Sequence, residues 1–338
     1  LAERSNYLIT CCPGGESTRH IIDAEVLRAL GPEGYVVNIA RGSVVDTVAL
    51  IAALNNGVIA GAALDVFAEE PAKDNPLFGT PGLVCTPHLG ASTDEAQVNV
   101  AIQVAEQLSD FLLSGGVTNA LNMPSLSAEE APRVRPYMAL AEKLGSLVGQ
   151  LLGKDIRGVE IEVEGAAAQL NIKPISGAVL AGLMRVYSDT VNMVNAPYLA
   201  RERGLDVREV RHDRTQDYHT LLRVTVTTDE GERSVAGTLF GDAQPRLVEL
   251  FGIKIEADLG GDMLYIVNED IPGFIGKVGT ALGEAGVNIG TFHLGRRTGV
   301  RGDEAVLLLS VDHPVDEPVM WKICNLDGVK KVKGLGFK

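Results

Sequence analysis

The chain has 338 residues, 46% of them hydrophobic, and its 30 lysines and arginines against 44 aspartates and glutamates give a formal net charge of −14. This charge argues against nucleic-acid binding, and the hydrophobic content argues against general disorder. No apolar run reaches the roughly 18 residues of a membrane span. The four cysteines show no C-x-x-C pairing and indicate neither a disulfide framework nor a metal site. We therefore expect two or three domains in the reducing cytoplasm, with no membrane partner.

The first part of the sequence alternates between strand and helix signals. Short apolar runs predict strands at residues 7–11, 35–38, 59–65 and 83–86. Helical spacing predicts the helices between them at residues 22–30 and 46–56. Strands separated by helices indicate a parallel, doubly wound sheet, in which ligands bind beyond the carboxyl ends of the strands.

A glycine-rich phosphate-binding loop is absent from the sequence. The pattern G-x-G-x-x-G occurs nowhere, and the one G-x-G is Gly334-Leu335-Gly336 near the end of the chain. The chain also starts without the strand–helix–strand unit that such a loop would open. We therefore expect this chain to be the C-terminal portion of a longer protein, holding only part of a Rossmann-like sheet.

Two further units follow a long helix predicted over residues 93–113 and a Gly/Asn/Pro/Ser-rich linker at 115–127. The middle unit mixes helices (136–152, 177–192 and a short one ending at 204) with strands (158–163, 221–228 and 234–239). The last unit has strands at 263–267, 288–294, 305–311 and 329–332 and helices at 274–285 and 315–324. Its order is β-α-β-β-α-β, which is that of a ferredoxin-like domain.

Polar side chains follow three of the predicted parallel strands, so Arg41, Glu70 and His88 can converge on one crevice. Arg41 can hold a carboxylate with its planar fork, and His88 can exchange a proton with a hydroxyl because imidazole titrates near neutral pH. Glu70 can fix the imidazole tautomer. Each residue alone is also typical of an ordinary surface or turn position. Together they favour oxidation of a 2-hydroxy acid, with a nicotinamide as hydride acceptor.

Three segments resemble the signature blocks of the D-isomer-specific 2-hydroxyacid dehydrogenases: NIARGSVVD (38–46), GAALDVFAEEP (61–71) and CTPHLGAST (85–93). From about residue 75 onwards the chain resembles the long-form D-3-phosphoglycerate dehydrogenases. The resemblance implies an α/β chain made of a partial doubly wound parallel sheet, an α+β intervening domain and a ferredoxin-like ACT domain. The implied domains are a partial NAD-binding domain (1–94), a return helix and linker to a substrate domain (95–125), an allosteric substrate-binding domain (126–258) and the ACT domain (262–338).

The same resemblance implies roles for individual residues. Arg41 would orient the substrate, Glu70 would be the carboxylate of a catalytic dyad, and His88 would be its acid/base. The implied contacts to NAD are Cys12, Ile39, Ala40, Arg41, Asp65, His88, Leu89, Gly90 and Ala91.

The implied reaction is NAD-dependent oxidation of 3-phospho-D-glycerate to 3-phosphohydroxypyruvate, the entry to L-serine biosynthesis, by a homo-oligomer that is a tetramer in the family. Because the phosphate loop is missing, we expect the chain alone neither to bind NAD tightly nor to turn over substrate. Two alternatives stay open. Residues 11–46 look closer to glyoxylate/hydroxypyruvate reductases, and the chain could also be a non-catalytic amino-acid sensor.

The last unit contains a second candidate site, because NEDIPGFIG (268–276) ends a strand and opens a helix. The resemblance to ACT domains implies an L-serine effector site at Asn268, Asp270 and Asn288, shared across a two-fold interface and used for feedback inhibition. Backbone N–H groups at the helix start can hold the carboxylate of an amino acid. The alternative is that Asp270 only caps the helix.

The middle unit holds a concentration of basic residues: Arg201, Arg203, Arg208, Arg211, His212, Arg214, Arg223, Arg233 and Arg246. One interpretation is a solvated face on which these residues pair with neighbouring acids. The other is an anion site for a phosphorylated effector, as the resemblance to the allosteric domain implies.

Overall fold

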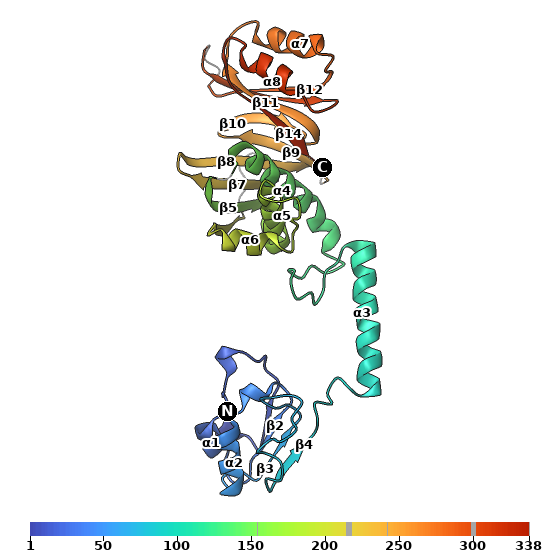
Figure 1. Cartoon of the computed structure of the whole chain (residues 1–338), viewed down its shortest axis with the longest axis vertical. Helices are drawn as coiled ribbons and strands as arrows, with labels where there is room; N and C mark the ends of the chain where they lie inside the picture. Colours follow the sequence, from blue (N-terminus) through green and yellow to red (C-terminus); the bar gives the residue numbers. More distant parts are fainter. Residues whose placement is uncertain (154, 214–217, 242, 299–301, 338) are drawn as a thin grey trace. The chain divides into compact units, whose positions relative to one another are not determined.

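The computed structural model describes residues 1–153, 155–213, 218–241, 243–298 and 302–337. The chain divides into two compact units, Leu1–Glu106 and Gln107–Lys338 (Figure 1). Helix α3 (Asp94–Ser114) joins them. Among the described residues, none of the helices combines the length and the apolar character that a membrane crossing requires.

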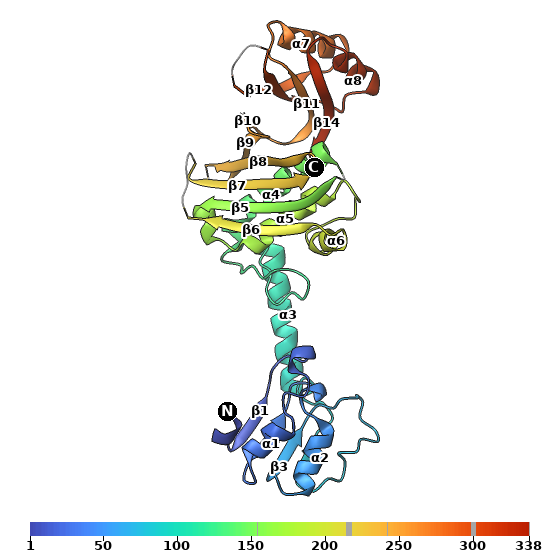
Figure 2. The ribbon, with the colours of Figure 1, turned by 90° about the vertical axis from the view of Figure 1, so that its left-hand side faces the viewer.

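The first unit is a parallel α/β layer (Figure 2). Its strands are β1 (Tyr7–Thr10), β2 (Tyr35–Asn38), β3 (Gly61–Leu64) and β4 (Leu83–Cys85), and they lie in that order in the sheet, all parallel. Its helices are α1 (Ala24–Leu30) and α2 (Thr47–Asn55), with short 3-10 turns η1 (Ala2–Arg4), η2 (Glu16–Thr18) and η3 (Gly42–Val44). The predicted parallel sheet is thus confirmed.

Both helices of this unit start at an aspartate. The side chain of Asp23 accepts hydrogen bonds from the first free N–H groups of α1, at 2.9 Å from each nitrogen, and Asp46 does the same for α2 at 2.9 and 3.1 Å. Such caps satisfy donors that have no partner within the helix. They set where each helix begins and therefore which side chains face the buried core between helices and sheet.

The second unit contains a six-stranded sheet with helices on one face (Figure 2). The strand order is β10 (Ile253–Ala257), β9 (Gln244–Leu250), β8 (Gly231–Phe240), β7 (Thr220–Thr228), β5 (Ile156–Gly165) and β6 (Asp206–His212). The helices are α4 (Ala131–Leu152), α5 (Ile172–Met184), α6 (Ala196–Glu202) and the turn η4 (Ala166–Gln169). This is the predicted α+β intervening domain.

Helices α4 and α5 approach closely because glycines line their contact. A Cβ added at Gly182 would lie 2.1 Å from the Glu142 carbonyl oxygen and 2.7 Å from the Ser146 nitrogen. We predict that Gly182→Ala lowers the free energy of unfolding by about 1–3 kcal/mol, because the added methyl meets backbone atoms that no rotamer change can move away. Denaturant unfolding measures this. The matched control is Gly279→Ala in another helix, where none of the described atoms lies within 4 Å of the added Cβ. This variant should not lower the free energy of unfolding. An equal loss in both variants would contradict the contact.

The prediction of a helix over residues 177–192 is wrong at both ends. Asn171 caps α5 by accepting from the Lys173 N–H at 3.2 Å, so the helix starts earlier, and it ends at Met184. Beyond it, Asn192 and Asn195 hydrogen-bond to nearby backbone groups and hold the chain in turns. Short polar side chains compete in this way with helical hydrogen bonds.

The last sheet is antiparallel and carries two helices on one face, in the ferredoxin-like order that was predicted (Figure 1). Its strand order is β12 (Ile289–Arg296), β13 (Glu304–Val311), β11 (Gly261–Glu269) and β14 (Val329–Phe337), and its helices are α7 (Phe274–Glu284) and α8 (Glu317–Cys324). Its other face shares a buried apolar cluster with the intervening domain. Gln150 also bonds Gly336 twice, at 2.9 and 2.8 Å. The predicted domain limits at residues 94, 125 and 258 stay predictions.

Candidate functional site

The residues predicted for catalysis and for NAD lie at the carboxyl edge of the parallel sheet. Cys12 follows β1, Arg41 follows β2, Asp65 follows β3, and His88 follows β4. This clustering is the consequence of parallel strands, whose carboxyl ends all meet at one edge.

A buried amide shapes the turn that carries Arg41. Asn38 is 1% exposed, and its Oδ1 accepts from the Thr10 hydroxyl at 2.7 Å and from the Ala40 N–H at 3.0 Å, while its Nδ2 donates to the Arg41 carbonyl at 3.0 Å. Every polar atom of this side chain therefore has a partner, as a buried amide requires. The guanidinium of Arg41 donates to the Ala40 carbonyl at 2.7 Å and stays exposed at the edge of the sheet. The sequence analysis did not predict the structural role of Asn38. An asparagine at the end of a buried strand is a pattern that could have indicated it.

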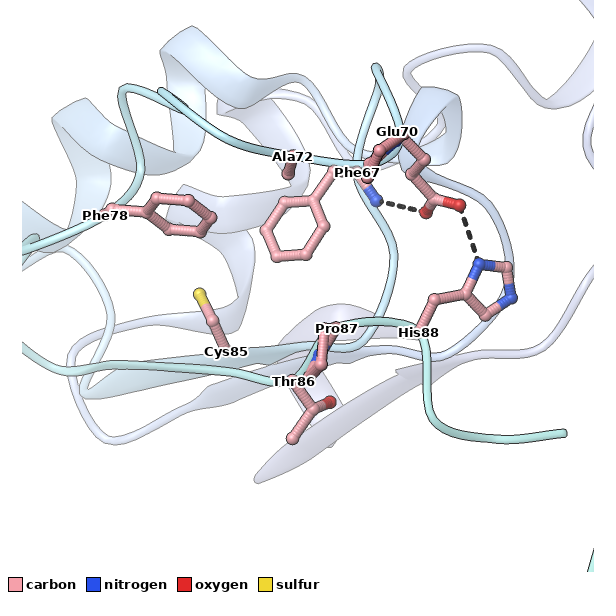
Figure 3. Close-up of a pocket in the computed structure, with 9 residues that line it drawn as sticks. Phe67, Glu70, Ala72, Phe78, Cys85, Thr86, Pro87 and His88 are labelled. Atoms are coloured by element: carbon pink, nitrogen blue, oxygen red, sulfur yellow. Dashed lines mark hydrogen bonds and ion pairs between the residues drawn. The ribbon is translucent and has the colours of Figure 1, made fainter. Parts of the chain in front are cut away.

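Glu70 and His88 form a hydrogen-bonded pair (Figure 3). The His88 Nδ1 lies 2.7 Å from Glu70 Oε2, and the Phe67 N–H donates to Glu70 Oε1 at 2.9 Å. The Phe67 bond and then the His88 bond lower the pKa of Glu70 below its ordinary value of 4.5, with help from nearby Arg41 and against the effect of burial. Glu70 is therefore a carboxylate near neutral pH and can only accept hydrogen bonds. The proton of a neutral His88 then resides on Nδ1, and Nε2, on the side of the ring away from Glu70, is free to accept one.

Asp65 holds the segment that carries His88. Its Oδ1 accepts from the Thr86 hydroxyl at 2.5 Å and from the Leu89 N–H at 2.8 Å, and its Oδ2 accepts from the Gly90 N–H at 3.1 Å. His88 takes a left-handed backbone with φ of 56°, which is uncommon for a residue other than glycine. Asp65 accepts hydrogen bonds from Thr86 before His88 and from Leu89 and Gly90 after it, and these bonds stabilise that conformation. The further prediction that Asp65 contacts NAD stays a prediction.

The protonation of Asp65 gives a pH prediction. Burial, the largest single influence, raises the pKa of Asp65, but hydrogen bonds from Thr86, Leu89 and Gly90 together with His88 bring it below its ordinary value of 3.8. A pKa lowered by folding means that the carboxylate stabilises the fold above about pH 3.8 and loses this effect as the pH falls through the folded value.

We therefore expect Asp65→Asn to lower the free energy of unfolding at pH 7 by about 1–2 kcal/mol, and so to lower the unfolding temperature. The difference in stability between variant and wild type should shrink below pH 3.8. Thermal unfolding across this pH range measures the effect. Asp74→Asn, at an exposed aspartate of the same unit, is the control and should change neither the unfolding temperature nor its dependence on pH. A difference that stays constant from pH 7 to pH 3 would contradict the role of the carboxylate.

The Glu70–His88 pair opens on a cavity of about 540 Å³ (Figure 3). Its other lining residues are Phe67, Pro71, Ala72, Phe78, Cys85, Thr86 and Pro87. The rings of Phe67 and Phe78 meet edge to face with centroids 5.6 Å apart, and burial raises the pKa of the Cys85 thiol, which stays protonated. A small molecule in this cavity would meet apolar walls and one acid/base pair, and the walls would strengthen polar interactions by excluding water.

The residues at this edge fit the nicotinamide end of NAD. Ile39 is 56% exposed and Leu89 is 42% exposed, so each offers an uncovered apolar surface beside polar groups. A flat, partly apolar ring needs this combination. Of the other predicted contacts, Cys12 is half-buried, Ala40 is buried, and Gly90 and Ala91 are exposed. Which of them touch NAD stays a prediction.

A second site lies at one end of the antiparallel sheet, in a cavity of about 450 Å³ lined by Asn268, Asp270, residues 271–275, Leu294 and Arg296. Asn268 is 2% exposed, and its Oδ1 has no hydrogen-bond partner among the described residues. Asp270 Oδ2 lies 3.1 Å from Arg296 Nε. The sequence did not point to Arg296, because an arginine ending a strand is usually solvated.

The structure does not bring Asn288 to this cavity within one chain. Asn268 and Arg296 both flank Ala305 of β13, whereas Asn288 lies just before Ile289, which pairs with Val311 at the other end of that strand. The separation is six strand residues, or roughly 20 Å. The three predicted effector residues can therefore meet only if a second copy contributes Asn288.

Four of the nine basic residues of the middle unit have acidic partners among the residues that the structure describes. The pairs are Arg208–Asp206 at 2.8 Å, Arg223–Glu249 at 2.9 Å, Arg246–Asp258 at 3.0 Å and His212–Glu162 at 2.9 Å. The guanidinium of Arg203 lies 3.9 Å from the ring centre of Tyr187. Arg214 lies outside the described residues. These contacts favour the interpretation as a solvated, charge-paired face.

Three family models match the chain in consecutive stretches. The NAD binding domain of the D-isomer specific 2-hydroxyacid dehydrogenases matches residues 1–90, the D-3-phosphoglycerate dehydrogenase intervening domain matches residues 133–251, and the ACT domain matches residues 263–328. Residues 1–90 are thus similar to the NAD binding domain of the D-isomer specific 2-hydroxyacid dehydrogenases. The three matched domains and their order, together with the curated relatives, support a long-form D-3-phosphoglycerate dehydrogenase.

Two curated relatives and one solved structure are similar to parts of this chain. D-3-phosphoglycerate dehydrogenase of a Synechocystis strain is 37% identical over 98% of this chain and 60% of its own length, and that of Bacillus subtilis is 36% identical over 98% and 63%. The chain thus spans about three fifths of the length of these curated relatives. A solved glyoxylate/hydroxypyruvate reductase from Sinorhizobium meliloti, in complex with NADP and malonate, is 39% identical over 34% of this chain and 36% of its own, with a TM-score of 0.32.

Proposed function

We propose that the full-length gene product oxidises 3-phospho-D-glycerate to 3-phosphohydroxypyruvate with NAD, at the start of L-serine biosynthesis. The observation that carries the proposal is the Glu70–His88 hydrogen bond of 2.7 Å beside a cavity, with Arg41 near enough to lower the pKa of Glu70. Relatives that are 36–37% identical and carry this name support the choice of substrate.

The geometry supports a proposed role for each of the three side chains. His88 Nε2 accepts the proton of the C2 hydroxyl, while Nδ1–H stays bound to Glu70 and keeps the ring in place. The Glu70 carboxylate stabilises the imidazolium that forms. Arg41, on the same edge, holds the substrate carboxylate. NAD, when bound, supplies the acceptor for the hydride that leaves C2 as the carbonyl forms.

Steady-state turnover of the full-length gene product tests the proposal. We expect NADH to form with NAD and 3-phospho-D-glycerate, with kcat/KM at least about tenfold above that for D-glycerate. A preference for reducing unphosphorylated glyoxylate or hydroxypyruvate would assign the protein to the reductases instead. Binding of L-serine without any turnover would favour the non-catalytic sensor.

We also propose that the ACT domain binds L-serine as a feedback effector between two copies of the chain. The buried Oδ1 of Asn268, unpartnered among the described residues, supports a polar ligand in this cavity. Strand β12 is an edge of its sheet, so two copies can pair these edges antiparallel and bring Asn288 of a second copy to Arg296. Inhibition of turnover by L-serine tests the effector role. The tetrameric state and the cytoplasmic location stay predictions.

A further inference from the structure

Among the described residues, the cavity of the ACT domain is lined by one negative and one positive side chain, and they are paired with each other. The Asp270 carboxylate is 17% exposed, and it lies 3.1 Å from Nε of Arg296, which is 54% exposed. Both line the cavity of about 450 Å³. The carboxylate is thus largely withdrawn from water, and among the described residues this guanidinium compensates its charge.

Two further groups face the same space. The Oδ1 of Asn268 is a buried acceptor without a partner among the described residues, and its Nδ2 is already bound to the Glu269 carbonyl at 2.7 Å. Helix α7 begins at Phe274 after Gly273, and none of the described side chains caps it. The cavity therefore offers two acceptors, Asp270 and Asn268, and two sources of positive potential, Arg296 and the helix N-terminus.

Ligands of different charge leave this cavity with different numbers of unpaired charges. A ligand with only an ammonium group can replace Arg296 at Asp270, but it leaves the guanidinium without a counter-charge. A ligand with only a carboxylate can attract Arg296, but it leaves Asp270 largely buried and unpaired, which is costly. A zwitterion exchanges the one internal ion pair for two new ones and leaves no charge uncompensated.

We propose that Arg296 selects zwitterionic α-amino acids by leaving Asp270 for the ligand carboxylate while the ligand ammonium takes its place between Asp270 and Asn268. The inference rests on the proposed effector function of this cavity and adds to it a residue that sets ligand class. In the free protein Arg296 occupies the ammonium position, so the ion pair of 3.1 Å is the unliganded form of the site.

Calorimetric titration of the 338-residue chain tests the exchange with three ligands: L-serine, L-serinamide (which lacks the carboxylate) and 3-hydroxypropionate (which lacks the ammonium). We expect L-serine to bind at least about tenfold more tightly than either analogue. Arg296→Gln should weaken L-serine about tenfold and bring it level with L-serinamide. Arg296→Lys keeps the positive charge but lacks the planar guanidinium, so its affinity for L-serine should lie between those of the wild type and Arg296→Gln.

Arg297→Gln is the matched control, because this neighbouring arginine is bound to Glu304 at 2.6 Å and does not line the cavity. It should leave the affinity for L-serine unchanged. Equal affinities of the wild type for L-serine and L-serinamide would overturn the proposal, and this comparison needs no variant. Full retention of L-serine affinity and discrimination in Arg296→Gln would also overturn it.

The two proposals fail in different ways. If the wild type ignores L-serine but binds another neutral amino acid, the effector identity is wrong, and the same comparison on that amino acid and its amide decides the role of Arg296. If L-serine binds and Arg296→Gln makes no difference, the effector role stands and the inference on Arg296 falls. If no neutral amino acid binds, both fall.

Discussion

Replacing His88 by glutamine is expected to lower the kcat of the full-length gene product by about 10²–10⁴-fold, the range that a positioned acid/base supplies. Glutamine keeps a hydrogen-bonding side chain beside Glu70 but cannot accept the proton of the substrate hydroxyl. The dissociation constant of the nicotinamide cofactor should change less than about threefold, because the reaction and not the binding is impaired. Rapid-mixing kinetics and cofactor fluorescence measure the two quantities.

His313→Gln provides the control for this substitution. His313 is exposed, and its Nδ1 contacts only the following Pro314 carbonyl, at 3.1 Å, among the described hydrogen bonds. Its replacement should leave kcat unchanged. If His88→Gln kept the wild-type kcat, His88 would have no part in the chemistry, and the proposed mechanism would be wrong.

Gly42→Ala is expected to have the largest effect on stability in the first unit. A Cβ at this position would lie 1.9 Å from the carbonyl carbon of Phe67, 2.1 Å from its oxygen and 2.3 Å from the Ala68 nitrogen. All three are backbone atoms, so the loop itself must move. We expect a loss of about 3 kcal/mol in the free energy of unfolding, at the upper end of the usual cost of overpacking.

The same variant should also lower kcat, because the displaced loop carries the Phe67 N–H that holds Glu70. Denaturant unfolding and steady-state kinetics measure the two effects. Gly90→Ala is the control for stability, since its Cβ would come no closer than 3.5 Å to Asp65 Oδ2. Wild-type stability in Gly42→Ala would show that the turn and the loop are not in contact.

The clustering of Arg41, Glu70 and His88 could be predicted because it needs only the order and direction of the strands. Each residue follows a strand of a parallel sheet, and such ends meet at one edge. The bonds from Asp65 to residues 86–90 could not be predicted, because they depend on the path of a loop after its strand. The same holds for the approach of Gly42 to the backbone at Phe67.

In the second unit, local sequence patterns failed to predict several strands. Strands β6, β9 and β10 were not predicted. Strand β6 (DVREVRH) is polar and largely exposed, so it lacks the alternation that marks a half-buried strand, and its position is set by pairing with β5. Asp270 and Arg296 are 26 positions apart in sequence, and no local pattern connects them.

In the proposed mechanism, Glu70 acts on the reaction through His88. A double-mutant cycle in kcat tests it most directly, with wild type, Glu70→Gln, His88→Gln and the double variant of the full-length gene product. We expect Glu70→Gln to lower kcat at least about tenfold when His88 is present and to leave the residual rate of His88→Gln unchanged. An equal factor in both backgrounds would show that the two side chains act independently and would contradict the dyad.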